Sequence, residues 1–240
     1  MGGDRVPAAR QSASETFAGD GPSAAAGTLE AILLAAGESR RMGYPKPLLK
    51  LGSRTFIEIL VAAMLPSVAR LIVVVGAHAS AVRGAISSDP RVAVVENPDY
   101  LRGQLSSIKA ALAQLRPDAA GALIHLADHP MVRADTFAAV IDGYRRAGGR
   151  WRQSWAPAAR PGGRIAIARY QGRRGHPVLF SRELFDELAA APEDQGARVV
   201  VAADPARVTY VDVNDAGVVT DLDTPEDLER AGLARPPKQP

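Results

Sequence analysis

Short unbroken apolar runs alternate with stretches of helical periodicity along most of this chain, and that alternation restricts the fold more than any other feature. These runs lie at residues 31–34, 70–75, 92–95 and 122–126, and all of their residues are apolar except Arg70 and His125. Between and after them, apolar residues recur at helical spacing, for example Phe56, Ile57, Leu60 and Met64, then Phe137, Val140, Ile141 and Tyr144. Continuous apolar strands separated by helices indicate a parallel sheet that is covered on both faces. We therefore predict an α/β protein with a doubly wound, mostly parallel sheet.

The two ends of the 240-residue chain do not share this pattern. Residues 1–28 are rich in Gly, Ala, Ser and Pro without a hydrophobic period, and residues 234–240 hold three prolines, so both are predicted to be disordered tails. One domain over residues 29–233 remains. Within it, residues 151–175 are rich in Arg, Gly and Pro, with one short strand candidate at 165–167. We interpret that region as a loop or hairpin near the ligand cleft.

Composition excludes several classes of function. The chain has no cysteine, so disulfides, cysteine–zinc sites, iron–sulfur clusters and a cysteine nucleophile are ruled out. Aromatic residues make up 5% and the net charge of +3 comes from scattered arginines, which disfavours a nucleic-acid partner. Residues 1–28 lack the apolar core of a signal peptide, and no apolar run could span a bilayer. We expect a cytoplasmic protein with no membrane contact.

The loop after the first predicted strand carries the features of a polyphosphate site. Gly37 lets the backbone approach a ligand closely, and Arg40, Arg41 and Lys46 supply cations. Ligands of doubly wound sheets bind beyond the carboxyl ends of strands, where this loop falls. The spacing is neither that of a Walker A loop nor that of the dinucleotide fingerprint. A solvated basic turn is the plain alternative.

Two later segments also follow predicted strands. Asp128 comes just past 122–126, where a carboxylate is well placed for Mg²⁺, a cation that prefers oxygen ligands and substrate phosphates. Asn97-Pro98 follows 92–95, and turn chemistry alone could explain it. Near the other end, Thr224 is predicted to N-cap a helix, with Pro225 at its first position and Asp227 completing a capping box.

The segment Leu34-Ala35-Ala36-Gly37-x-Ser39-x-Arg41-Met42-Gly43-x-x-Lys46-x-Leu48-Leu49 resembles the signature of MobA-like nucleotidyltransferases, and within them the molybdenum cofactor cytidylyltransferases. The resemblance implies a glycosyltransferase-A-like fold. It also implies that Leu34, Ala35, Ala36 and Gly37 hold the base and sugar, that Lys46 meets the phosphates, and that Arg41 is the loop arginine of the family. Guanine-using relatives carry Gly where this chain has Ala36, so the resemblance favours CTP.

The same resemblance assigns roles to residues further along the chain. It places Asn97 near the nucleotide, makes Asp128 a nucleotide and metal ligand, and makes Asp223 of Asp221-Leu222-Asp223-Thr224-Pro225 the second metal carboxylate. Arg174 and His176, in Arg173-Arg174-Gly175-His176-Pro177, are implied to bind the acceptor, although a surface basic turn is the alternative for the arginines. Residues 195–198 match a family segment on the acceptor side without a defined role, and His129 is given none.

The implied activity is Mg²⁺-dependent transfer of CMP from CTP to a molybdopterin-type acceptor, with Arg41, Lys46 and Asp128 as the catalytic residues. A transient contact with a molybdoenzyme or its chaperone is compatible with this reading. Three alternatives stay open. The nucleotide could be GTP, the acceptor could be a sugar phosphate, or the protein could be a non-catalytic chaperone that binds nucleotide or pterin for a molybdoenzyme.

Overall fold

The computed structural model describes residues 28–148 and 163–235. Residues 1–27 of the predicted tail 1–28, most of the predicted tail 234–240 and the first part of the predicted hairpin region lie outside these residues. Thr28, assigned to the tail, is instead the first residue of β1. The strands are β1 (Thr28–Ala35), β2 (Lys50–Leu51), β3 (Arg54–Thr55), β4 (Arg70–Val75), β5 (Val92–Glu96), β6 (Ala119–Leu126), β7 (Ile165–Tyr170), β8 (Arg173–Ser181) and β9 (Val208–Asp212). The α-helices are α1 (Phe56–Met64), α2 (Ala79–Ala85), α3 (Gln104–Leu112), α4 (Ala134–Arg146), α5 (Phe185–Ala190), α6 (Arg198–Ala203) and α7 (Pro225–Arg230).

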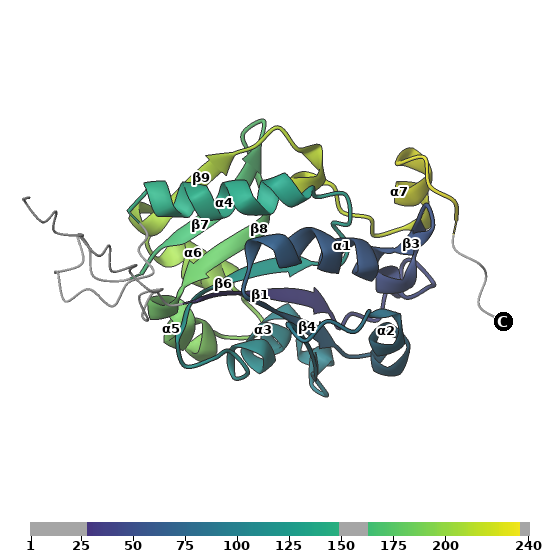
Figure 1. Ribbon diagram of the computed structural model, residues 1–240, viewed down its shortest axis with the longest axis horizontal. Helices are drawn as coiled ribbons and strands as arrows, with labels where there is room; N and C mark the ends of the chain where they lie inside the picture. Colours follow the sequence, from purple (N-terminus) through teal and green to yellow (C-terminus); the bar gives the residue numbers. More distant parts are fainter. Residues whose placement is uncertain (1–27, 149–162, 236–240) are drawn as a thin grey trace, which may run out of the picture.

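The main sheet has seven strands in the order β5-β4-β1-β6-β8-β7-β9 (Figure 1). β1, β4, β5 and β6 pair in parallel, β7 and β9 pair in parallel, and β8 runs antiparallel to both β6 and β7. The α/β class and the mostly parallel sheet are thus confirmed. Within this sheet, every strand except β8 ends at one edge, and β8 begins there, whereas β2 and β3 form a separate two-stranded sheet. Loops far apart in the sequence therefore meet at that edge.

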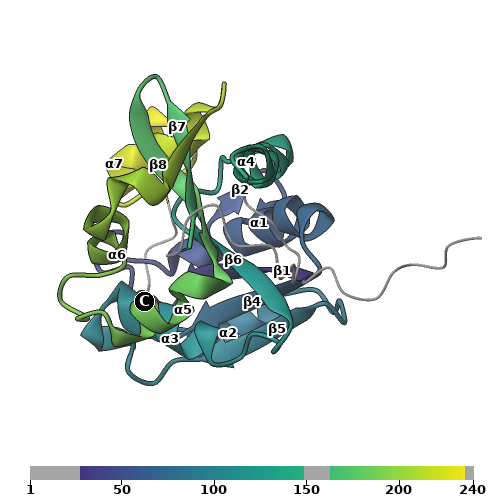
Figure 2. The same cartoon turned by 90° about the vertical axis from the view of Figure 1, so that its left-hand side faces the viewer.

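Helices cover both faces of the sheet because side chains of the strands point alternately to either face. Leu33 of β1 packs in a core cluster with residues of α1, α2 and α4, whereas the next residue, Leu34, packs with residues of α3, α5 and α6. Figure 2 shows the sheet edge-on between its helices. A third, smaller cluster joins the loop after β1 to α7 through Met42, Leu49, Phe56, Leu222 and Leu228.

The predicted elements agree with the structure. The predicted run 70–75 coincides with β4, and 165–167 is the start of β7, which forms an antiparallel hairpin with β8. The periodic residues from Phe56 to Met64 coincide with α1. Helix α3 begins directly after Gly103, which takes φ +107° and serves as the N-cap. None of the helices in the described ranges combines the length and apolar composition of a bilayer span.

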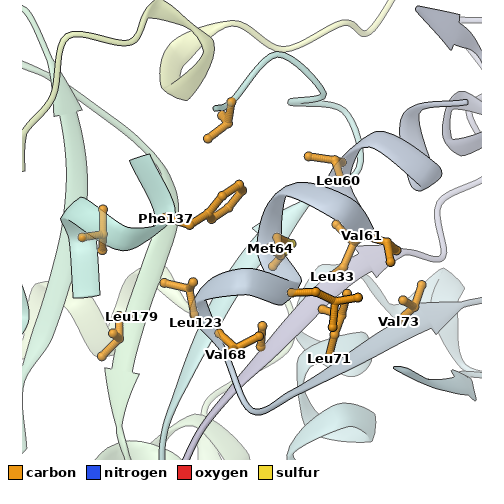
Figure 3. Packing of buried hydrophobic residues seen from close by; sticks show 14 of the residues in the cluster. Leu33, Leu60, Val61, Met64, Val68, Leu71, Val73, Leu123, Phe137 and Leu179 are labelled. Atoms are coloured by element: carbon orange, nitrogen blue, oxygen red, sulfur yellow. The ribbon is translucent and has the colours of Figure 1, made fainter. Parts of the chain in front are cut away.

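Phe137 lies in the middle of the first core cluster and is fully buried (Figure 3). Phe137→Ala should reduce the free energy of unfolding by about 3–5 kcal/mol, because it removes buried apolar surface and leaves a cavity. Urea denaturation measures this loss. Leu101→Ala is the control: Leu101 is 67% exposed, and its truncation should cost less than about 0.5 kcal/mol. Equal costs for the two variants would contradict the core assignment.

Candidate active site

A cavity of about 330 Å³ opens at the carboxyl edge of the sheet and is called here the first cavity. Six of the predicted site residues line it: Leu34, Ala35, Ala36, Gly37, Lys46 and Asp128. The first four end β1 and begin its loop, and Asp128 follows β6, the neighbouring strand. Their meeting follows from the parallel pairing of β1 and β6.

Lys46 is the centre of the charges at this cavity. Its Nζ lies 3.1 Å from Oδ2 of Asp128 and 2.6 Å from Oδ1 of Asp223. The three side chains are only 17–25% exposed. The backbone N–H of Lys46 donates to Oγ of Ser39 at 3.0 Å, which fixes the start of the short turn Lys46–Leu48. The structure thus brings both predicted metal carboxylates to a single ammonium group.

Burial by itself would lower the pKa of Lys46. The charge of Asp128 and the hydrogen bonds that Lys46 donates to both carboxylates outweigh this effect, so the pKa is raised. Burial would likewise raise the pKa of Asp223. The bonds and charges of Lys46 and Arg41 overcome that effect, so the pKa of Asp223 is lowered. Lys46 is therefore charged, and Asp223 ionised, throughout the neutral pH range.

Asp128 and Asp223 are held together by the backbone. The N–H of Leu222 donates to the carbonyl of Asp128 at 2.9 Å, and the Leu222 side chain is buried in the third cluster. On the other side, the N–H groups of Asp223 and Thr224 donate to Oδ2 of Asp227, at 2.9 and 2.7 Å. The predicted capping box at the start of α7 is confirmed, and it also orients Asp223.

Arg41 stands apart from the first cavity. Its Nη2 lies 2.5 Å from Oδ2 of Asp223, and its side chain is 72% exposed. It is not among the residues that line the cavity. Arg40 pairs instead with Glu38. Of the three cations in the loop, only Lys46 faces the cavity, and Arg41 reaches the site through Asp223.

Asn97 lies behind the wall of the first cavity. Its side chain is buried, with Nδ2 donating to Oγ of Ser106 at 2.9 Å and to Oγ of Ser107 at 3.0 Å. Its Oδ1 accepts the N–H of Asp99 at 3.0 Å, as in the turn that the sequence suggested as an alternative. Ser107, and not Asn97, lines the cavity. The geometry gives Asn97 a supporting position behind Ser107.

A second cavity of about 890 Å³ lies beside the first. Arg173, Arg174 and His176 line it, together with residues 193–198. These residues reach the carboxyl edge because β8 runs backwards: Val178 pairs with Ile124 of β6, so the residues before it extend past the end of β6. A Cβ on Gly175 would lie 1.8 Å from the carbonyl oxygen of Val218, so only glycine permits this close approach of β8 to the segment that leads to Asp221 and Asp223.

Two residues, Gly103 and Gln104, line both cavities and form the wall between them. Tyr100 and Leu101, just before them, line the first cavity. Sequence reasoning missed Gln104, Tyr100 and Leu101. Their position directly after Asn97-Pro98 was the only signal available.

Three histidines cluster between the second cavity and the core. The ring centroids of His129 and His176 are 5.4 Å apart, and His125 lies 6.2 and 6.3 Å from them. Burial and the neighbouring imidazoles lower the pKa of His125 well below its usual value and that of His176 to about 4. Nε2 of His129 lies 3.8 Å from Oδ1 of Asp128. His129, which the sequence analysis left without a role, thus borders the site carboxylate.

Asp128 offers a ligand for a cation. Its Oδ1 is buried and has no hydrogen-bond partner within the described part of the chain. Within residues 28–148 and 163–235, no group of three or more His, Asp or Glu side chains is arranged to hold a metal ion. Two carboxylates with an unsatisfied oxygen fit Mg²⁺ or Mn²⁺ only if phosphate oxygens or waters complete the shell, the usual arrangement where Mg²⁺ accompanies a nucleotide.

Comparison with known proteins agrees with this geometry. The model of the MobA-like NTP transferase domain matches residues 31–208. The molybdenum cofactor cytidylyltransferase of Escherichia coli is 26% identical over 200 residues, which cover 83% of this chain and 93% of that protein. The molybdenum cofactor guanylyltransferase of Sinorhizobium fredii is 34% identical over 96 residues, 40% of this chain and 42% of that protein.

Among solved structures, Rv0371c of Mycobacterium tuberculosis is 33% identical with a TM-score of 0.69, covering 85% of this chain and 97% of that one. Its manganese complex is 31% identical with a TM-score of 0.64, at the same coverage. The chain belongs to the MobA-like NTP transferase family, and it is a nucleotidyltransferase related to the enzymes that attach cytidine or guanosine nucleotides to the molybdenum cofactor.

The low pKa of His176 makes stability depend on pH. The unfolded chain takes up a proton on this imidazole near pH 6.5, whereas the fold resists protonation down to about pH 4. The stabilising contribution of neutral His176 is therefore fully present above pH 6.5. As the pH falls from 6.5 to 4, the free energy of unfolding decreases by up to about 3 kcal/mol. Urea denaturation between pH 4 and 7 measures it.

His176→Gln should remove the His176 share of this pH dependence and leave the share of His125. His78→Gln is the matched control because His78 lies outside the histidine cluster, and it should leave this pH dependence unchanged. An identical pH profile for the wild type and His176→Gln would contradict the assignment.

Proposed function

We propose that the protein transfers CMP from CTP to the phosphate of a molybdopterin-type acceptor and releases pyrophosphate, in a reaction that requires Mg²⁺. One observation carries the proposal: Lys46, Asp128 and Asp223 converge at the edge of the sheet where two cavities of different size share a wall. The product would pass to a molybdoenzyme or its chaperone in the cytoplasm through a transient contact.

In the proposed step, an oxygen of the acceptor phosphate attacks the α-phosphorus of CTP. A new phosphorus–oxygen bond forms as the bond to the oxygen bridging the β-phosphorus breaks, and pyrophosphate leaves with that electron pair. The attacking oxygen is already ionised at neutral pH, so no general base is required. No covalent enzyme intermediate is needed. Positioning and charge stabilisation suffice, as in other phosphoryl transfers.

Lys46 is the cation proposed to meet the triphosphate. Without substrate its Nζ donates hydrogen bonds to two carboxylates. A bound triphosphate would compete with these carboxylates for the ammonium group. Arg41, held by Asp223 at the rim, is proposed to add a second cation. A bound Mg²⁺ would supply further charge neutralisation, with Asp128 and Asp223 as the residues that hold it.

Base selection is proposed to depend on the turn after β1. Residues 34–37 line the first cavity with small or apolar side chains, and Ala36 is 6% exposed. A methyl group at position 36 narrows the space next to the backbone, which supports the smaller pyrimidine over a purine. The similarity to the Escherichia coli cytidylyltransferase over most of both chains supports the same choice.

The second cavity is proposed to hold the acceptor. It is more than twice the volume of the first, at about 890 against 330 Å³, which suits a ligand larger than the nucleotide portion opposite it. Arg173 and Arg174 line it and supply charge for a phosphate, while Val178 and Phe180 supply an apolar wall. His176, neutral above about pH 4, adds a hydrogen-bonding group without adding charge.

Incubation with each NTP in turn, Mg²⁺ and molybdenum-loaded molybdopterin tests the activity. We expect pyrophosphate and a cytidine-linked pterin with CTP, and loss of both on addition of EDTA. Pyrophosphate release with GTP alone would instead assign the guanosine reaction. Tight binding of nucleotide and pterin without pyrophosphate would contradict catalysis and favour the chaperone.

Lys46→Ala and Asp128→Asn should each lower kcat by roughly 10²-fold or more, because each removes a charge aimed at the transition state. Steady-state kinetics at saturating CTP measure the change. Lys50→Ala and Asp135→Asn, at exposed positions outside both cavities, are matched controls that should keep wild-type rates. Near-wild-type turnover of Lys46→Ala would contradict the role of Lys46.

A further inference from the structure

The wall between the two cavities is thin and depends on a tight turn. Gly103 takes φ +107°, a conformation that side chains rarely adopt, and Gln104 begins α3 directly after it. A Cβ on Gly103 would lie 3.8 Å from the backbone oxygen of Glu193. The wall therefore touches the segment between α5 and α6, which lines the second cavity.

Glu193 connects that segment to the wall through two ion pairs. Its Oε2 lies 2.7 Å from Nε of Arg102, the residue before Gly103, and its Oε1 lies 3.6 Å from Nζ of Lys109 on α3. Lys109 also donates to the carbonyl of Ala191 at 2.9 Å. The Glu193 side chain is 19% exposed. Each carboxylate oxygen thus has its own cation. Lys109 is 27% exposed and its ion pair is screened less than a surface pair, whereas Arg102 is 63% exposed.

The positions of these groups connect the two cavities. Tyr100 and Leu101 line the first cavity, and Arg102 follows them in the same short turn. Glu193 lines the second cavity with residues 194–198. A ligand that orders the turn at Tyr100 also orders the partner of Glu193. The segment that faces the acceptor then loses less conformational freedom when the acceptor binds.

We propose that Glu193 is a positioning residue that couples the two cavities. Nucleotide bound in the first cavity then raises the affinity of the second cavity for the phosphate-bearing acceptor. This inference rests on the proposed function. Coupling between sites is reciprocal, so acceptor should tighten nucleotide binding by the same factor. Glu193 does not line the first cavity, and its carboxylate oxygens are paired with Arg102 and Lys109. Its removal should therefore alter affinities and leave the chemical step unchanged.

Amide hydrogen exchange on the full chain tests the coupling without the acceptor. The probes are the unreactive α,β-methylene analogues of the four NTPs with Mg²⁺. In the wild type, the analogue that binds should slow exchange in residues 191–198 as well as in 100–107. In Glu193→Gln the slowing should persist at 100–107 and disappear at 191–198. Binding that leaves 191–198 unchanged in the wild type would overturn the proposal.

Kinetics provide the second readout. Glu193→Gln should raise KM for molybdopterin by about fivefold or more, the lower end of usual coupling, and leave kcat at saturation close to that of the wild type. The double variant Arg102→Glu/Glu193→Arg, which reverses the ion pair, should recover part of the loss. Glu187→Gln is the matched control: it breaks a glutamate–arginine pair with Arg207 outside both cavities. A fall in kcat with KM unchanged would overturn the positioning role.

The two readouts separate this proposal from the proposed function. If nucleotide binds but molybdopterin does not react, the acceptor assignment fails and the exchange pattern alone decides the coupling. If none of the four analogues binds, both proposals are wrong.

Discussion

One largely buried ammonium group, that of Lys46, forms ion pairs with both carboxylates of this site. Lys46 comes from the loop after the first strand, whereas Asp128 and Asp223 come from the middle and the end of the chain. Two carboxylates this close would repel one another, and the cation between them removes that cost. The same group is then the nearest positive charge to any phosphate in the first cavity. In the proposed reaction, a structural and a catalytic role would both fall on this side chain. The two carboxylates keep its pKa raised despite its partial burial.

The sheet topology delivers every motif to one edge. Parallel strands β1, β4, β5 and β6 bring their following loops there, as in other doubly wound sheets. The reversed strand β8 adds something that a wholly parallel sheet would not offer, namely the start of a strand at the same edge. Arg173, Arg174 and His176 enter the second cavity for this reason. Mixed strand direction thus places two cavities side by side at this edge.

Local sequence patterns predicted most of the architecture, because unbroken apolar runs and capping residues act over a few residues. The strands β1, β4, β5 and β6, the start of β7, the capping box at Thr224 and six residues of the first cavity follow from such patterns or from the family signature, whereas β8, β9 and the turn at Tyr100 do not. Long-range pairings were beyond that reasoning. The sequence around Glu193 does not indicate its ion pairs with Arg102 and Lys109. The sequence around Asn97 does not indicate that its side-chain amide donates hydrogen bonds to Ser106 and Ser107. The histidine cluster likewise depends on β6 and β8 being neighbours.

The backbone hydrogen bond between Leu222 and Asp128 has a consequence for folding during synthesis on the ribosome. The chain emerges from its amino end, so the first six strands of the fold and Lys46 are available long before Asp223. Until residues 222–228 arrive and pack against Met42, Leu49 and Phe56, Lys46 has only one of its two carboxylates. A nascent chain can therefore build most of its sheet while the full charge set is still missing. Residues 222–228, which are synthesised after all the strands of the main sheet, therefore complete the site.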